Sequence, residues 1–282
     1  MRRIEVLRAG PMTTVQDLGR PGLAQHGIPP SGGADLPALT LGNRLVGNPL
    51  EAAALEATLA GPRLRFEGAA IVALAGAEAN ATVGGRPVPR GRPIAVAHGE
   101  TLELGGFRRG VRGYVCVRGG VDAEPTLGSR SADLLTGLGP PPLRDGDLLA
   151  VGAEPGSPPG AAGAVADLPD ELVLRVRLGP RDDWFTEAAV ERLCSADWRV
   201  TSASNRVGIR LVGPLLERRQ LGELLSEGVV TGAVQVPPAG RPIVLLPDHP
   251  TTGGYPVIAV VESRDLWLAG QAGPGATVHF AA

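Results

Sequence analysis

The sequence predicts a mainly β protein with a few short helices. Glycine and proline are abundant, at 41 and 27 of the 282 residues, and they separate short runs of Val, Leu and Ile. Aromatic residues make up only 3% of the chain, whereas the hydrophobic fraction of 43% is sufficient for a buried core. Because short apolar runs bounded by turn formers are typical of strands in sandwiches and barrels, we expect strands to dominate.

The first elements are expected to be a strand and a polar loop. Residues 4–8 (IEVLR) are predicted as the first strand. Residues 10–22 are rich in turn formers, with Asp17 and Arg20 close enough in sequence to pair locally, so they are expected to form either a self-capped surface loop or a loop that faces a substrate.

Two helix starts follow this loop. Asp35 is predicted to cap the first helix, because the apolar residues after it have helical spacing, and Gly47 is predicted to end it. Asn48, Pro49 and Glu51 then stand at the positions that these residue types prefer in the first turn of a helix. We therefore expect a second helix to begin at Asn48.

Between residues 64 and 152 the pattern predicts a series of short, separate strands bounded by Gly, Pro or Asp-Gly. Gly84-Gly85 and Asp145-Gly146 are predicted to form hairpin turns. The predicted strands are residues 71–74, 82–83, 94–97, 102–104, 114–117 and 148–151.

A low-complexity Pro/Gly/Ala stretch marks the expected domain boundary. Residues 156–168 are predicted as a linker between an N-terminal β domain (1–155) and a C-terminal β-barrel domain (169–282). In the second domain we expect one short helix amid strands. The predicted helix is residues 184–193, and the predicted strands include residues 172–178, 232–236, 243–246, 257–261 and 277–280, with a turn at 237–240.

Charge and residue spacing exclude several classes of function. The net charge of −2 argues against nucleic acid or an anionic membrane as a partner. No apolar run is long enough to span a bilayer and no export signal is visible, so a cytoplasmic protein is expected. Cys116, Cys194 and the four histidines have no metal-ligand spacing, so no protein-held metal site is expected. The chain contains no lysine, which excludes Schiff-base chemistry, a P-loop lysine and an attached biotin within it.

The richest polar segment follows the predicted strand at 243–246. Residues 248–255 contain a carboxylate, an imidazole, two hydroxyls, two glycines and a phenol. The glycines allow positive φ and a close approach of the backbone to a ligand. Upstream, Asn205 and Arg206 are interpreted as a bulge that faces a cleft, with an ion pair between Arg206 and Glu227 as the purely structural alternative.

Several motifs carry a resemblance to a known family. They are SEGVVTGAVQVPP (226–238), TTGGYP (251–256), SNRVG (204–208), GPMTTVQDLGRPG (10–22), GIPPSGGAD (27–35), LVGNP (45–49) and LGSRS (127–131). In this order they resemble the biotin-dependent carboxyltransferase family, which includes allophanate hydrolase subunit 2 and the C subunit of 5-oxoprolinase. Ala34 stands where the family usually has Met, which leaves the shape of that loop open.

The resemblance implies two cyclophilin-like β-barrel domains and an enzyme that works in a complex. The leading expectation is a component of a bacterial ATP-dependent 5-oxoprolinase, which opens 5-oxo-L-proline to L-glutamate. Its partners would be an allophanate hydrolase subunit 1-type protein (the B subunit of 5-oxoprolinase) and a third subunit, with ATP used through the complex. The chain length and the absence of attached biotin carboxylase or carrier segments favour this assignment.

Two alternatives stay open. One is the carboxyltransferase component of a biotin-dependent urea or amide carboxylase, in which biotin takes part. The other is a regulatory binding protein that antagonises a histidine-kinase inhibitor.

The candidate site residues come from both halves of the chain. Arginine and amide donors suit an anionic ligand or a developing oxyanion, and a partly buried carboxylate suits a general base. Catalytic roles are assigned to Arg206, Glu227, Asp248 and Thr252. Substrate-binding roles are assigned to Asn205, Gln235, Thr251, Gly253, Gly254 and Tyr255, and to Arg20, Ser31, Asp35, Ser129 and Arg130. We expect both groups to line one polar cleft between the two domains.

Overall fold

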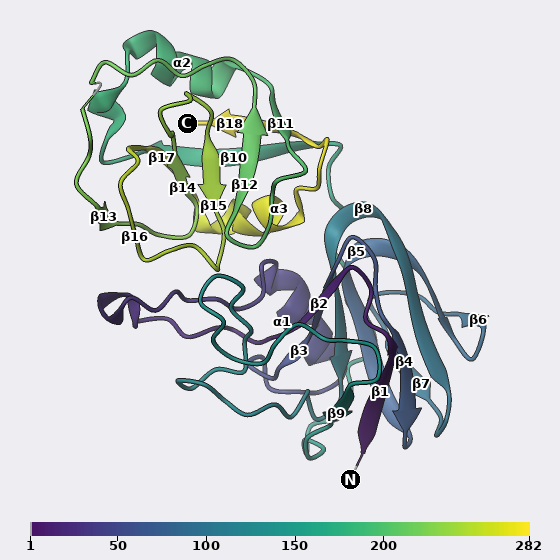
Figure 1. Ribbon diagram of the computed structural model, residues 1–282. Coiled ribbons are helices and arrows are strands. Elements are labelled where there is room, and N and C mark those ends of the chain that lie inside the picture. Colours follow the sequence, from purple (N-terminus) through teal and green to yellow (C-terminus); the bar gives the residue numbers. More distant parts are fainter. Residues whose placement is uncertain (1, 221) are drawn as a thin grey trace. The chain divides into compact units, whose positions relative to one another are not determined.

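The computed structural model describes residues 2–220 and 222–282 (Figure 1). The chain divides into two compact units. Unit 1 comprises the residues up to Arg20 together with Ser31–Asp167, and unit 2 comprises Pro21–Pro30 and Leu168–Ala282. The mainly β prediction is confirmed, since the described residues contain eighteen strands and three α-helices of ten residues or fewer. None of these helices is both long enough and apolar enough to cross a bilayer.

Unit 1 is built on a curled nine-stranded sheet. Six of its strands follow the order β2-β3-β8-β4-β1-β9, and β5 pairs with β6, β7 and β8. The strands are β1 (Arg3–Arg8), β2 (Met12–Gln16), β3 (Ala54–Thr58), β4 (Arg63–Glu67), β5 (Ala70–Val83), β6 (Arg86–Pro87), β7 (Pro93–Val96), β8 (Thr101–Val117) and β9 (Leu148–Ala150). Side chains such as Ile4, Leu64 and Phe66 form its main core, and α1 (Leu36–Leu45) packs on the sheet through a second cluster that includes Leu39 and Tyr114.

Two long strands replace the short ones that the sequence predicted in unit 1. β5 spans 14 residues and β8 spans 17, so the predicted breaks near Gly76 and Gly110 lie inside strands. Both glycines have positive φ, and the pairing register shifts just after Gly76. Glycines inside a strand mark bulges and bends as often as ends. The strand β2 was likewise missed, because its hydroxyl-rich sequence resembles that of a loop.

The helix predictions in this unit have different outcomes. Asp35 caps α1 as predicted, since its carboxylate accepts the Ala38 N–H at 2.9 Å. The second helix start at Asn48 is wrong. The Asn48 amide instead donates to the Val117 carbonyl and accepts the Gly119 N–H, each at 2.8 Å. A tertiary partner therefore uses the side chain that would have capped a helix.

Unit 2 contains a closed seven-stranded barrel with the strand order β10-β17-β14-β15-β12-β11-β18 (Figure 1). These strands are β10 (Glu171–Leu178), β11 (Trp198–Val200), β12 (Gly208–Val212), β14 (Ala233–Gln235), β15 (Ile243–Leu245), β17 (Val257–Val261) and β18 (Thr277–Ala281). The first strand, β10, closes the ring by pairing antiparallel with β17 and parallel with β18. The turn between β14 and β15 is closed by the Gly240 N–H, which donates to the Pro237 carbonyl at 2.9 Å.

Two helices flank the barrel, α2 (Glu187–Ser195) and α3 (Leu266–Gln271), which lie at opposite sides of it (Figure 1). Both contribute to a core that also contains Trp198 and Phe280, whose ring centroids are 6.5 Å apart. The Trp198 indole donates to the Leu193 carbonyl of α2 at 3.0 Å, so this helix is fixed to the barrel by a buried hydrogen bond as well as by apolar contact.

The Pro/Gly/Ala stretch before the barrel is held against unit 1. The Gly160 N–H donates to the Leu45 carbonyl, and the Gly163 N–H donates to the Gly91 carbonyl, each at 2.9 Å. The Arg118 guanidinium binds the carbonyls of Pro155 and Ser157. Although this stretch is rich in proline and glycine, hydrogen bonds to its backbone fix its path.

Candidate functional site

The predicted site residues form two clusters of loops, one in each unit. In unit 2 the most buried members are Arg206 and Asp248, which are 2% and 0% exposed. The guanidinium donates to the carboxylate at two points, from Nε to Oδ2 and from Nη2 to Oδ1, each at 2.9 Å. The Asp248 N–H also donates to the Arg206 carbonyl at 3.1 Å. This pair joins the chain before β12 to the loop after β15, and the expected alternative of an Arg206–Glu227 ion pair is wrong.

Because Arg206 and Asp248 are buried, we interpret their ion pair as part of the structural framework of unit 2. Both side chains are sealed from solvent, and each satisfies the other's charge, which buried ions require. Asn205, next to Arg206, is exposed, and its carboxamide oxygen accepts the N–H groups of Val207 and Gly208 in a local turn. The pair and the turn together fix the path of the chain into β12.

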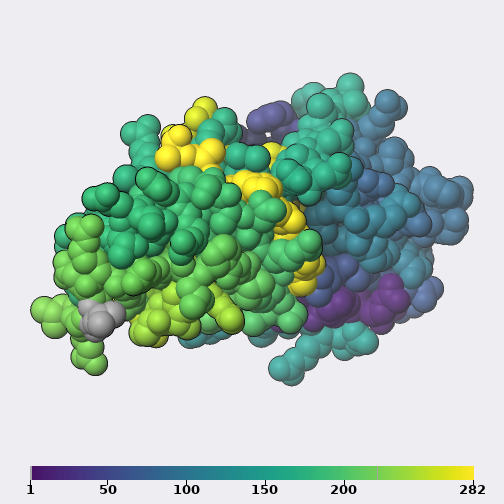
Figure 2. Space-filling model, turned by 90° about the horizontal axis from the view of Figure 1, so that it is seen from above, coloured from purple at the N-terminus to yellow at the C-terminus, as the bar shows by residue number. Residues whose placement is uncertain are grey.

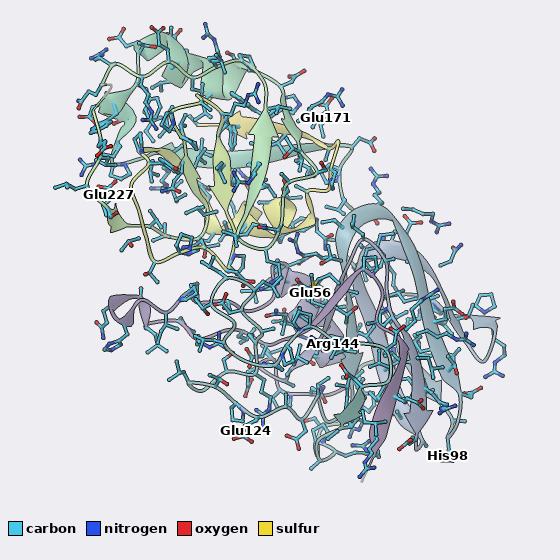
Figure 3. The ribbon with its side chains drawn as sticks, viewed as in Figure 1. Glu56, His98, Glu124, Arg144, Glu171 and Glu227 are labelled. Atoms are coloured by element: carbon cyan, nitrogen blue, oxygen red, sulfur yellow. The ribbon has the colours of Figure 1, made fainter. Side chains whose placement is uncertain are left out.

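Glu227 and Thr252 meet on a short two-stranded ribbon. The strand β13 (Glu227–Gly228) pairs antiparallel with β16 (Thr252–Gly253), so Thr252 lies opposite Gly228 at an exposed position. Glu227 lies on β13 at the edge of the unit (Figure 3). Its Oε2 accepts two hydrogen bonds from Arg181, at 3.0 and 2.7 Å. This bond raises the pKa of the Arg181 guanidinium above its usual value.

Arg181 is a candidate site residue that the sequence did not indicate, because it lies shortly after β10 in a segment that resembles a simple strand end. Its partner Glu227 keeps one buried oxygen, Oε1, without a hydrogen bond among the described residues. The ribbon is thus tethered by an ion pair that leaves one acceptor uncommitted.

The glycine loop at 253–254 packs closely on Gln235. Gln235 is buried, and its Nε2 donates to the Tyr255 carbonyl at 3.3 Å. A Cβ added at Gly253 would lie 2.5 Å from that nitrogen. A larger residue at position 253 would therefore need the end of the Gln235 side chain to move, which would disturb its hydrogen bond to the Tyr255 carbonyl. Thr251 beside it is half-buried, and its carbonyl accepts the Val229 N–H.

A cavity of about 820 Å³ opens beside this loop in unit 2. Its wall includes Gly254 and Tyr255 from the predicted site and two cationic residues that were not predicted, Arg192 and Arg218. The remaining lining residues are Leu215, Leu216, Glu217, Gly222, Glu223, Leu224, Pro238, Ala239 and Gly240.

In unit 1 the loops converge on Asp17, which the sequence analysis placed in a local pair with Arg20. Oδ1 of Asp17 accepts the hydroxyls of Ser129 and Ser131 at 2.6 and 2.5 Å, and Oδ2 accepts the Arg130 N–H at 2.6 Å. Arg20 instead donates to the carbonyls of Thr126 and Ser131. Asp17 therefore organises the 129–131 loop, and the expected Asp17–Arg20 pair is wrong.

Four buried polar atoms in and beside this cluster have no hydrogen-bond partner among the described residues: Oε1 of Gln16, Nη1 of Arg20, Oγ of Ser31 and Nε of Arg130. The Arg20 and Ser31 side chains are 3% and 6% exposed. Ser31 has a φ of 51°, and Gly32 follows with a φ of 89°. A cation and a hydroxyl beside a strained backbone are typical of binding loops.

The loop that carries Asp35 is held by two residues that the sequence analysis missed. The buried Glu56 on β3 accepts the Tyr114 hydroxyl at 2.6 Å and the Ala34 N–H at 2.9 Å (Figure 3). The Tyr114 oxygen accepts the Asp35 N–H at 2.8 Å. Burial first, and then the nearby carboxylates of Glu56 and Asp35, raise the pKa of Tyr114 well above its usual value. Because these partners are distant in sequence, no local pattern identifies them.

Arg130, the other arginine of this cluster, lies near a carboxylate. Its Nη2 lies 3.5 Å from Asp122, and it lines a second cavity of about 430 Å³ in unit 1 with Glu51 and Gly120. No group of three or more His, Cys, Asp or Glu suited to a metal ion occurs among residues 2–220 and 222–282. The donors of both clusters are arginines, amides and hydroxyls, which suit anions and carbonyl oxygens.

Comparison with known proteins gives a consistent result along the whole chain. The sequence is 40% identical to the 5-oxoprolinase C subunit of Escherichia coli (strain K12), over 98% of this chain and 90% of that protein. It is 34% identical to urea amidolyase of Lachancea kluyveri, over 98% of this chain and 17% of that protein. The crystal structure of Kluyveromyces lactis urea carboxylase matches with a TM-score of 0.91 at 32% identity, over 99% of this chain and 27% of that one.

The chain thus spans less than a third of those two fungal proteins and nearly all of the bacterial one. The family described as carboxyltransferase domain, subdomain A and B, matches residues 26–282. Because this family matches most of the chain, and because the E. coli protein is 40% identical over 98% of it, the chain belongs to the carboxyltransferase domain A and B family.

Proposed function

We propose that this protein is a component of an ATP-dependent 5-oxoprolinase that opens 5-oxo-L-proline to L-glutamate. The observation that carries the proposal is its likeness to the 5-oxoprolinase C subunit of E. coli along nearly the whole of both chains. We further propose that it acts in the cytoplasm with a partner like the B subunit of 5-oxoprolinase and with a third subunit, and that ATP is used through this complex.

Ring opening adds one water across the amide bond of the lactam. A nucleophile adds to the ring carbonyl carbon, the carbonyl oxygen becomes an oxyanion, and the ring nitrogen leaves with a proton. Donors fixed before the reaction stabilise such an oxyanion best. The proposed oxyanion donors are the exposed Thr252 hydroxyl and the nearby Gly254 amide. In unit 1, the unpartnered Nη1 of Arg20 is a proposed donor to an anionic ligand.

Glu227 is the proposed general base, because its Oε1 is uncommitted on the ribbon that carries Thr252. Arg206 and Asp248 take a positioning role in this proposal, since each is occupied by the other and closed to solvent. Asn205, Gln235, Thr251 and Tyr255 shape the unit 2 loops, and Ser31, Asp35, Ser129 and Arg130 shape those of unit 1.

The test is reconstitution with the other subunits of the E. coli enzyme. In a strain that lacks its own C subunit, this chain is expected to restore ATP-dependent glutamate formation from 5-oxoproline in extracts. Thr252→Ala and Glu227→Gln are expected to lower kcat, while Arg210→Gln, an exposed change on β12, serves as a matched control. Normal assembly without any turnover of 5-oxoproline would count against the proposal.

The second candidate is the carboxyltransferase step of a urea or amide carboxylase, which the likeness to urea amidolyase favours. Biotin would then take part on another chain, because this chain has no lysine to carry it. Carboxylation of urea in the presence of carboxybiotin, with no turnover of 5-oxoproline, would select this function.

A further inference from the structure

The 820 Å³ cavity of unit 2 contains a cation without an anionic partner. Arg218 is half-buried in its wall, and no carboxylate of the described residues lies within ion-pair distance of it. One of its five N–H donors is used, in a hydrogen bond from Nη2 to the Val236 carbonyl. Nε is buried and has no partner in the described part of the chain. Burial lowers the pKa of the Arg218 guanidinium below its usual value, and Tyr255 is close enough to oppose that shift.

Apolar residues surround this cation. Leu215, Leu216 and Leu224 line the same cavity, and Pro238 and Ala239 of the β14–β15 turn contribute to its wall. Arg192 of α2 is held at the edge by a hydrogen bond to the Leu215 carbonyl at 3.2 Å. The wall segment before residue 221, light green in Figure 2, lies at the surface of unit 2. Arg218 is therefore partly accessible to solvent and has apolar side chains beside it in the cavity wall.

The charge of the lining restricts the ligand. Arg192 and Arg218 are offset by Glu217 and Glu223, so the ionisable residues of the wall sum to no net charge. A nucleoside triphosphate brings several negative charges, which this wall does not neutralise. A single carboxylate brings one negative charge and can pair with Arg218, which has no ion-pair partner among the described residues.

From this geometry we propose that the cavity is a binding site for a small monocarboxylate, whose carboxylate pairs with Arg218 and whose ring or chain packs on the leucines. Tyr255 forms the side of the site next to the 253–254 glycine loop. Naming 5-oxo-L-proline as the natural ligand rests on the proposed function, whereas the monocarboxylate site itself rests on the cavity alone.

The experiment measures binding to the full chain by calorimetry with three probes of similar ring size. They are 5-oxo-L-proline, cyclopentanecarboxylate and 2-pyrrolidinone, which has the lactam but no carboxylate. The two carboxylates are expected to bind and 2-pyrrolidinone is not. Arg218→Gln is expected to weaken carboxylate binding about tenfold or more, as loss of a charge-assisted hydrogen bond does. Arg210→Gln makes the same charge change on an exposed strand position and is expected to leave binding unchanged.

Each outcome separates the site from the function. Equal binding of carboxylates to Arg218→Gln and wild type, or equal binding of 2-pyrrolidinone, overturns the site. Arg218-dependent binding of cyclopentanecarboxylate without binding of 5-oxoproline keeps the site and removes the proposed ligand. Turnover of 5-oxoproline by the complex with an unchanged KM in Arg218→Gln keeps the function and removes 5-oxoproline as the ligand of this cavity. ATP binding that depends on Arg218 contradicts the charge argument.

Arg218→Lys keeps the charge but loses the planar arrangement of the guanidinium donors. It replaces Arg218→Gln if that variant fails to fold, and it is expected to weaken carboxylate binding as well.

Discussion

Arg206 and Asp248, 42 residues apart in the chain, form a two-point ion pair that is closed to solvent within the barrel unit. Breaking a buried pair by removing one partner leaves an uncompensated charge, which typically costs about 3–5 kcal/mol. We therefore expect Arg206→Met and Asp248→Leu each to lower the free energy of unfolding by about that amount in urea denaturation.

The double variant gives the control for this prediction. Replacing both ions with apolar side chains removes the unpaired charge, so the double variant is expected to be more stable than either single variant. Additive losses in the double-mutant cycle would show that the two residues act independently.

The ion pair between Arg181 and Glu227 leads to a prediction about activity. It tethers the ribbon that presents Thr252, yet the Arg181 side chain is 38% exposed, so its loss is expected to change stability by about 1 kcal/mol or less. In the reconstituted complex, Arg181→Gln is expected to lower kcat several-fold, with a normal unfolding transition. Full activity in Arg181→Gln would remove the ribbon from the site, and Arg177→Gln, exposed on β10, is the matched control.

The acid stability of unit 2 is expected to depend on Asp265. Its carboxylate is buried and accepts hydrogen bonds from the Arg175 N–H at 2.9 Å and from Nε at 2.7 Å. The Arg175 side chain is the main reason that the pKa of Asp265 is lowered from 3.8. A lowered folded pKa gives stability that is present above pH 3.8 and is lost as the pH falls through the folded value.

The measurement compares urea denaturation of wild type and Asp265→Asn across this range. The wild type is expected to be the more stable protein at neutral pH, and the difference is expected to shrink below pH 3.8. If the difference in unfolding free energy does not change with pH, the charge of Asp265 does not contribute to stability, and only its packing and its hydrogen bonds do.

Tyr114 is expected to stay protonated in strongly alkaline solution. Burial raises its pKa well above 10.0, so the stabilisation that it gives is complete below that pH and is lost as the pH rises toward the folded value. In a Tyr255→Phe variant, Tyr114 is the only tyrosine left, because the chain has two. The ultraviolet band of tyrosinate is then expected to appear only when the protein unfolds, which circular dichroism detects independently. A tyrosinate band in the folded protein near pH 10.0 would contradict the buried Tyr114–Glu56 hydrogen bond.

The sequence predicts elements better than it predicts partners. The strand at 257–261 and the Asp35 cap follow from local patterns and lie where they were predicted. Glycine is ambiguous, because Gly84-Gly85 forms the predicted turn while Gly76 bends a continuous strand. The choice between these outcomes depends on neighbouring strands, which no local window contains.

The same limit applies to the candidate site. Residue types predicted the polar loops at 17–20, 129–131 and 251–255, and the first two carry buried polar atoms without a hydrogen-bond partner among the described residues. They did not indicate that Asp17 holds the 129–131 loop. They also did not indicate Arg181 and Arg218, which lie near the 251–255 loop. Partners such as Glu227 and Arg181 are 46 residues apart, and the fold alone decides which acid meets which arginine.

The pairing of β10 with both β17 and β18 has a consequence for synthesis. Residues 171–175 pair with 277–281, so the first strand of the barrel is hydrogen-bonded to its last strand. On a ribosome, the barrel stays incomplete until residue 281 has left the exit tunnel, and its edges are open until then. Nascent chains of this protein therefore expose an unclosed sheet for nearly all of the time that unit 2 is being translated, which is the period in which a chaperone or a partner protein has the most to bind.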